Sequence, residues 1–243
     1  MEFQRRNVIS ALFCAGVIVS IILLYTPYDK QTHTLSGDKL FNVLTFKDMQ
    51  SSMRELNKVA ALAGIGLIAT AFILGPLSRM FPVQFAQYLP WRKFVGIAGF
   101  ALAALHSVYS MIEFYRLDIG MMLFSNPNLP GFVSGAIGLL IFLAMALTAN
   151  GESVKRLGYR KWKALQTFGY AGLFLAIVHF VMLETKPDVG FDVRPYALLF
   201  LFIALVALLV RIGMTLVKVP QRESFGEHTG DDMAGQDLQP PKK

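Results

Sequence analysis

The sequence predicts an all-α membrane protein, a six-transmembrane-helix bundle with both termini in the cytoplasm. Of its 243 residues, 54% are hydrophobic and only 16% are charged, and the mean hydropathy is +0.50. These values exclude an ordinary soluble domain. Six apolar runs without a charged residue make up nearly half of the chain. A hydrocarbon layer of about 30 Å requires about 20 helical residues, so each run is expected to cross the membrane once.

The six membrane helices are expected in the order of these runs. The first run follows Arg5 and Arg6 as an export signal would, but no small-residue cleavage site comes after it, and we interpret it as a retained helix. A short helix between Asp48 and Asn57 is expected in the long loop that follows. The last run is 16 residues long and crosses only if its helix continues past Arg211. The runs cover residues 8–25, 59–78, 94–112, 132–149, 164–183 and 195–210.

The domain organisation follows from these runs. Residues 1–219 are expected to form one membrane domain, and residues 220–243, rich in Gly, Asp, Gln and Pro, are expected to be a disordered cytoplasmic tail. This tail is too short for a flavin or nicotinamide domain, and no G-x-G-x-x-G or Walker A sequence occurs in the chain.

The distribution of charge predicts the orientation. With the amino terminus inside, fourteen Lys and Arg residues lie on the cytoplasmic side and eight on the outer side, whereas nine of the sixteen acids lie outside. The positive-inside rule therefore predicts cytoplasmic termini in an inner (cytoplasmic) membrane. Because the net charge of +7 is spread along the loops, the lipid surface is the expected partner and nucleic acid is not.

Two of the four histidines, His106 and His179, fall inside apolar runs, where an ionisable ring is costly and commonly functional. His106 follows Arg92 by 14 residues and His179 follows Lys163 by 16, which are rises of about 21 Å and 24 Å on two outward-running helices. Both end the pattern G-x-x-L-A-x-x-H, with Gly99 and Gly172 seven residues earlier. A glycine there leaves a patch without a side chain beside each histidine, although glycine also serves close helix packing.

Two imidazoles at one depth favour a haem iron, which needs only two axial donors. Zinc would need further ligands, and the single cysteine, Cys14, excludes a disulfide, an iron-sulfur cluster and covalent haem attachment. One non-covalent b-type haem is therefore the expected cofactor. The alternatives are that the rings only form hydrogen bonds between helices, or that they relay protons.

Residues 59–217 resemble the ferric reductase-like transmembrane family, and within it the haem-binding membrane subunits of the periplasmic methionine sulfoxide reductase system (MsrQ or YedZ type). The resemblance depends on R-K-F-V-G at residues 92–96 followed by His106, and on L-G-Y-R at residues 157–160 with Trp162 and Leu165, followed by His179. It implies that His106 and His179 are the axial ligands of a membrane haem. It also implies a cytoplasmic electron donor, an outer acceptor such as a periplasmic reductase, and FMN near the cytoplasmic loops.

The chain departs from the family pattern at two positions. Gln166 stands thirteen residues before His179, where the sulfoxide reductase branch commonly has another histidine, and Lys93 stands thirteen residues before His106. A second, inner haem with two histidine ligands is therefore not expected.

The sequence thus favours a membrane electron carrier, and, if it is an enzyme, an oxidoreductase. Its single haem would lie near the outer face and pass electrons from a cytoplasmic flavin, quinol or reductase to an extracytoplasmic acceptor. Lys186, Arg116 and Arg194 are candidate partners for the haem propionates, or else bases that anchor helix ends at the interface. The alternatives from other classes are a non-redox scaffold or anchor subunit and a small transporter.

Overall fold

The computed structural model describes residues 2–29, 33–186 and 190–216, and most of these residues are helical. The predicted tail, residues 220–243, lies outside the described residues. The long helices are α1 (Glu2–Tyr25), α3 (Met49–Met80), α5 (Trp91–Tyr115), α7 (Leu129–Leu147), α9 (Tyr159–Glu184) and α10 (Pro195–Leu216). The shorter elements are α2 (Gly37–Leu44), α4 (Pro82–Phe85), the 3-10 helix η1 (Ala86–Tyr88), α6 (Ile119–Phe124), α8 (Gly151–Leu157), β1 (Tyr28–Asp29), β2 (Thr34–Leu35), β3 (Thr185–Lys186) and β4 (Gly190–Phe191).

The six long helices are long and apolar enough to cross a membrane, which confirms the predicted all-α six-helix membrane architecture. Two helices extend further than the apolar runs alone. α10 continues past Arg211 to Leu216, as a full crossing requires. The short helix expected between Asp48 and Asn57 is continuous with the second membrane helix, so that α3 has 32 residues.

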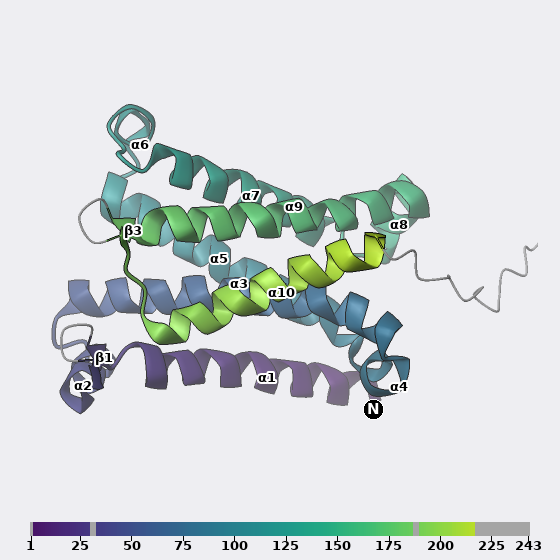
Figure 1. Cartoon of the computed structure of the whole chain (residues 1–243), viewed down its shortest axis with the longest axis horizontal. Helices are drawn as coiled ribbons and strands as arrows, with labels where there is room; N and C mark the ends of the chain where they lie inside the picture. The colour runs from purple at the N-terminus through teal and green to yellow at the C-terminus, as the bar shows by residue number, and fades with distance from the viewer. Residues whose placement is uncertain (1, 30–32, 187–189, 217–243) are drawn as a thin grey trace, which may run out of the picture.

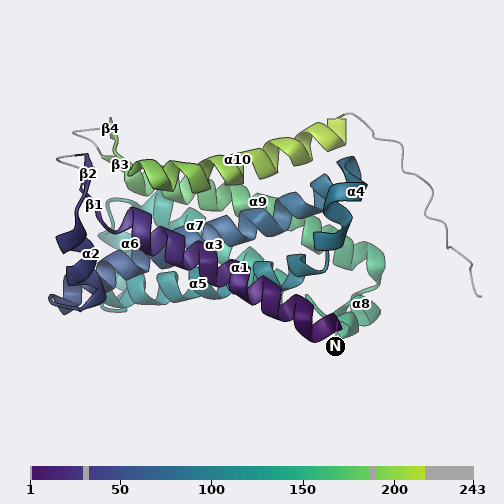
Figure 2. The same cartoon turned by 90° about the horizontal axis from the view of Figure 1, so that it is seen from below.

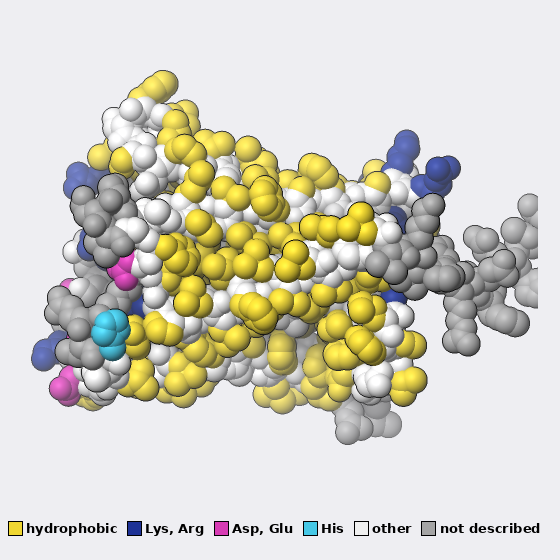
Figure 3. Space-filling model, viewed as in Figure 1, with side chains coloured by type: hydrophobic (Ala, Val, Ile, Leu, Met, Phe, Trp, Pro, Cys, Tyr) yellow, Lys and Arg dark blue, Asp and Glu magenta, His cyan; other side chains and the backbone are white. Residues whose placement is uncertain are grey.

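The long helices lie side by side along the long axis of the molecule (Figures 1 and 2). One end, called the hairpin end below, carries α2, α6 and the antiparallel hairpins β1-β2 and β3-β4. The other, called the α8 end, carries α4, α8 and the amino terminus (Figure 1). In the space-filling view, charged side chains gather at the two ends and the face between them is largely hydrophobic (Figure 3). This is the surface expected of a bundle surrounded by lipid.

The helix α3 is the centre of the bundle. In the most apolar 18-residue stretch of α3, 67% of the residues are buried, whereas the corresponding stretches of the other five long helices are only 11–28% buried. It packs against α5, α10 and α1, and a second close pair is formed by α7 and α9. Both pairs cross at glycines: a Cβ at Gly99 would lie 2.9 Å from the Gly64 carbonyl oxygen, and one at Gly138 would lie 3.2 Å from the Gly172 carbonyl oxygen. Small residues allow membrane helices this close an approach.

Candidate functional site

His106 on α5 and His179 on α9 face each other between the two helix pairs. The centres of their rings are 6.4 Å apart, and the ring planes are inclined by 74°. The helices that carry them have little direct packing on each other, because α5 packs on α3 and α9 packs on α7. The structure therefore brings together the two histidines that the sequence placed at one depth.

Each ring is held by a hydrogen bond at Nδ1. His106 Nδ1 lies 3.1 Å from Asn57 Oδ1 and 3.3 Å from the Asn57 carbonyl oxygen, and His179 Nδ1 lies 2.8 Å from the Gly131 carbonyl oxygen. Asn57 is itself oriented by its Nδ2, which donates to Ser110 Oγ at 2.9 Å. Carbonyl oxygens only accept, so each Nδ1 must donate. In a neutral imidazole this leaves Nε2 with a free lone pair, the arrangement found in metal-ligating histidines.

A cavity of about 210 Å³ lies beside the two rings. Its walls come mainly from α3, α5, α7 and α9, and it extends along the bundle from Lys58 and Glu184 near the hairpin end, past the two histidines, to Ile68 and Phe142. Most of the lining is apolar or aromatic. The lining includes Leu62, Ile65, Ala103, Met111, Phe132, Leu139, Phe142 and Phe180.

A glycine of α7 makes room for the second histidine. A Cβ at Gly135 would lie 2.5 Å from His179 Nδ1 and 2.8 Å from its Cε1, distances that side chains do not tolerate. The imidazole therefore rests directly on the backbone of α7. Sequence reasoning missed Gly135; the available signal was its place among Gly131 and Gly138 on one helix.

Gly99 and Gly172 lie elsewhere than the sequence interpretation suggested. A Cβ at Gly99 would meet Ile68 of α3 at 2.9 Å, and one at Gly172 would meet Ile141 and Phe142 of α7 at 3.1 Å. A neighbouring helix thus fills the space beside each glycine. Their shared place in the two G-x-x-L-A-x-x-H patterns reflects two similar helix crossings.

The three basic residues that the sequence suggested as partners for haem propionates lie in three different environments. Arg116 is exposed and ends α5 with a left-handed backbone (φ 51°). Lys186 lies in the β3-β4 hairpin, where it pairs with Gly190. Arg194 is buried just before α10, with 7% of its side chain exposed.

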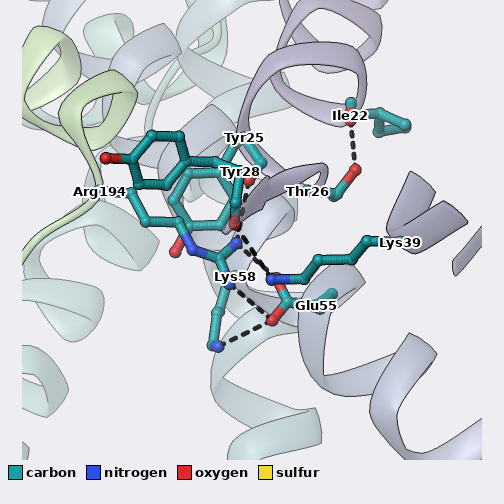
Figure 4. A network of polar contacts seen from close by, with 8 residues as sticks. All are labelled: Ile22, Tyr25, Thr26, Tyr28, Lys39, Glu55, Lys58 and Arg194. Carbon is teal, nitrogen blue, oxygen red and sulfur yellow. Dashed lines mark hydrogen bonds and ion pairs between the residues drawn. The ribbon is translucent and has the colours of Figure 1, made fainter. Parts of the chain in front are cut away.

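Arg194 is already paired with a carboxylate (Figure 4). Its Nη1 and Nη2 donate to Glu55 Oε2 and Oε1 at 2.7 and 2.9 Å, and Nη1 also donates to the Tyr25 carbonyl oxygen at 3.0 Å. The guanidinium lies over the Tyr25 ring, 4.3 Å from its centre. Burial by itself lowers the pKa of Arg194, but the hydrogen bonds that Arg194 donates to Glu55, together with the nearby charges of Glu55 and Glu184, raise the pKa above its usual value. This ion pair ties α1, α3 and α10 together at the hairpin end.

Two lysines complete the polar network in Figure 4. Lys58 Nζ lies 3.2 Å from Glu55 Oε1, and the Lys39 amino group donates to the Tyr28 carbonyl oxygen at 3.1 Å. Burial and the charge of Arg194 lower the pKa of Lys39. Lys58 also lines the cavity, one residue after the Asn57 that holds His106. Sequence reasoning counted Lys58 only as a loop charge, because it placed the start of the membrane helix at residue 59.

The interior of the bundle toward the α8 end is filled by aromatic side chains. Phe72 packs against Tyr170 and Phe142, with ring centres 4.5 and 6.4 Å apart. Gln166 Nε2 reaches the Met145 carbonyl and Thr148 Oγ1, both at 3.5 Å, and Lys93 is exposed. Within the described residues, no group of three or more His, Cys, Asp or Glu side chains is placed to hold a metal ion.

The comparisons with known proteins agree with this architecture. A family model described as "Ferric reductase like transmembrane component" matches residues 60–182. Proteins named "Protein-methionine-sulfoxide reductase heme-binding subunit MsrQ" are similar in sequence. The MsrQ of Agrobacterium fabrum is 25% identical over 130 residues (54% of this chain, 59% of that protein), and the MsrQ of Cronobacter sakazakii is 26% identical over 129 residues (53% and 63%). The MsrQ of Yersinia pseudotuberculosis is 25% identical over 164 residues (67% and 76%).

The match to the first two relatives spans about 60% of their length. The family model, by contrast, covers slightly more than half of the 243 residues, from α3 to α9, and contains both facing histidines. The chain therefore belongs to the ferric reductase-like transmembrane family.

Proposed function

We propose that this protein transfers electrons across the membrane and that His106 and His179 are the axial ligands of one b-type haem. The observation that carries the proposal is the pair of facing imidazoles in one cavity, each anchored at Nδ1. When bound, the haem iron supplies one-electron redox chemistry that no side chain of this chain provides. The protein supplies the two ligands, a low-dielectric seat and the charges around it.

The geometry of the two rings fits this role. Two imidazoles that hold one metal from opposite sides, through bonds of about 2.0 Å, have ring centres about 6 Å apart. The observed separation is 6.4 Å. The free Nε2 lone pairs are the donors required, and the sparse packing between α5 and α9 leaves the layer in which a flat group fits.

The charges at the hairpin end suggest how the acidic groups of such a cofactor would be neutralised. Lys186, Arg116 and Arg194 remain candidate partners, and Lys58 joins them because it lines the cavity. Arg194 would have to share its charge with Glu55, whereas Lys58 is 48% exposed and holds Glu55 through a single contact. We therefore favour Lys58 for this role.

The names of the relatives support the rest of the proposal. They are called heme-binding subunits of a protein-methionine-sulfoxide reductase, so a periplasmic reductase of that type is the acceptor we propose, with a flavin, quinol or reductase as the cytoplasmic donor. FMN near the α8 end stays a prediction from the resemblance alone. We place the α8 end in the cytoplasm and the chain in the inner membrane, which puts the histidines nearer the outer face.

The reduced-minus-oxidised optical spectrum of the purified protein tests the proposal. We expect Soret and α bands typical of a b-type haem in the wild type, and their loss in His106→Ala and in His179→Ala. His33→Ala is the matched control, because His33 is exposed in the loop between β1 and β2, and its ring contact among the described residues is with Tyr28, away from the cavity. A wild type that stays colourless when expressed with ample haem would leave the alternative, a non-redox scaffold or anchor subunit.

A further inference from the structure

A second group of charged side chains lies at the α8 end, apart from the histidine cavity. It consists of Arg79 near the end of α3, Arg92 near the start of α5 and Arg211 near the end of α10. The three residues, called the arginine cluster below, come from three helices. Arg92 and Arg211 lie over Phe72 and Tyr170, two rings that pack on each other, and Arg79 is close enough for its charge to act on Arg92 and on Tyr170 of α9.

Aromatic rings form the floor of the arginine cluster. The Arg92 guanidinium carbon lies 6.0 Å from the centre of the Phe72 ring, and that of Arg211 lies 5.4 Å from the centre of the Tyr170 ring. A Cβ at position 75 would lie 3.3 Å from Arg92 Nη1, so Gly75 leaves room for the guanidinium against α3. Two half-buried arginines therefore flank one packed aromatic pair.

The described part of the chain offers no counter-charge to these arginines. None of the three forms an ion pair or a side-chain hydrogen bond among the described residues, whereas the buried Arg194 at the other end has Glu55. The acidic side chain described at the α8 end is that of Glu152, which pairs with Arg156 at 3.0 Å. Figure 3 accordingly shows Lys and Arg side chains at this end, whereas the hairpin end shows acidic side chains as well as basic ones.

Like charges held together beside apolar surface repel strongly, because the local dielectric constant is low. The repulsion is relieved when an anion binds among them. One guanidinium group can donate two parallel hydrogen bonds to two oxygens of a phosphate. Several guanidinium groups can also bind the same multiply charged tetrahedral anion. The cluster also lies where membrane helices end, at the depth of lipid headgroups.

We propose that Arg79, Arg92 and Arg211 bind a phosphate group between α3, α5, α9 and α10 at the α8 end. An anionic phospholipid and a soluble phosphate compound share this chemistry. The site is independent of the histidine cavity, so its test does not depend on bound haem.

Thermal unfolding of the full chain in a neutral detergent tests the proposal and distinguishes the two sources. One arm compares inorganic phosphate with chloride at equal ionic strength, and the other compares phosphatidylglycerol with phosphatidylcholine in mixed micelles. We expect a rise in Tm of about 5 °C near saturation, as ligand linkage predicts. A response to phosphatidylglycerol alone identifies a lipid, and a response to inorganic phosphate identifies a soluble ligand.

Variants assign the response to the arginine cluster. Arg92→Gln and Arg211→Gln should each weaken the apparent affinity about 10-fold or more, because each removes charge-assisted hydrogen bonds. Arg156→Gln, at the same end but paired with Glu152, should respond like the wild type. If Arg92→Gln does not fold, Arg92→Lys replaces it in the test: it keeps the positive charge but loses the paired hydrogen bonds of the guanidinium, so it should also weaken binding. A wild type that responds to neither anion, or glutamine variants that respond as the wild type does, would overturn the proposal.

Discussion

At the scale of single residues, Asn57 influences how basic the Nε2 nitrogen of His106 is. Its side-chain and backbone oxygens both face Nδ1, at 3.1 and 3.3 Å, and attract the Nδ1 proton. An acceptor at Nδ1 makes the opposite ring nitrogen more basic. In the proposed carrier, a more basic ligand stabilises ferric iron, so Asn57 would lower the reduction potential.

Replacing Asn57 by Leu should therefore raise the reduction potential and weaken haem affinity about 10-fold, the lower end of the range for such supporting residues. The backbone oxygen of residue 57 remains, so the loss is partial. A spectroelectrochemical titration measures the potential, and haem content per protein measures the affinity. Ser110→Ala removes only the hydrogen-bond acceptor that orients the Asn57 amide, so it should change the potential in the same direction by a smaller amount. A potential equal to or below that of the wild type would contradict this role.

Gly135 permits a different prediction. In Gly135→Ala the new methyl group would lie within 3 Å of three atoms of the His179 ring, so the imidazole must move away from α7 and lose its bond to the Gly131 carbonyl. We expect haem content to fall at least as far as in Asn57→Leu while the protein stays folded. Gly213→Ala is the control, because nothing lies within 4 Å of that position. Full haem content in Gly135→Ala would mean that His179 can bind haem without lying directly against the α7 backbone at Gly135.

The sequence predicts some of these residues and not others for a physical reason. His106 and His179 stand out because a polar ring in an apolar run is unusual, and helical rise alone gives their depth. Asn57, Lys58 and Gly135 depend on how α3 and α7 are rotated about their axes, which hydropathy does not specify. For the same reason the sequence could not show that Arg194 is paired with Glu55.

At the scale of elements, α3 lacks one internal hydrogen bond, and a side chain of the neighbouring helix α9 replaces it. Pro76 has no N–H, so the Phe72 carbonyl lacks its usual partner four residues later. The Tyr170 hydroxyl of α9 donates to this oxygen at 2.9 Å. A buried carbonyl without a partner is costly, so this bond joins α9 to the central helix at the point where α3 is weakest.

Tyr170→Phe should therefore lower the free energy of unfolding by about 1–3 kcal/mol, because it leaves the Phe72 oxygen unsatisfied. In the Pro76→Ala background the same change should cost less, since an alanine at this position offers its backbone N–H to that oxygen. Denaturant titration in detergent measures both costs. Tyr88→Phe, in η1, is the control, because no hydrogen bond of its hydroxyl is found among the described residues. An equal cost in the two backgrounds would show that the hydroxyl acts on something other than the hydrogen bond missing at Pro76.

At the scale of the whole molecule, the two ends of the bundle differ in charge. At the α8 end the described charged side chains are basic apart from Glu152, whereas the hairpin end mixes acids and bases in ion pairs such as Arg54–Glu113 at 2.7 Å and Arg194–Glu55. Lys and Arg in short loops are retained on the cytoplasmic side during insertion, whereas Asp and Glu contribute little to this bias. The enrichment of Lys and Arg at the α8 end therefore predicts that this end faces the cytoplasm.

Alkaline phosphatase fusions in a bacterial host test the orientation, because the enzyme is active only after export. A fusion after Ser125, at the hairpin end, should be active, and one after Ala149, at the α8 end, should be inactive. A fluorescent protein fused to the carboxyl terminus should fluoresce, because α10 ends at the α8 end (Figure 1). The reverse pattern would leave the bundle and the histidine pair intact. It would, however, move the proposed haem to the cytoplasmic half, so that electrons would have to cross the packed Phe72–Tyr170 region to leave the cell.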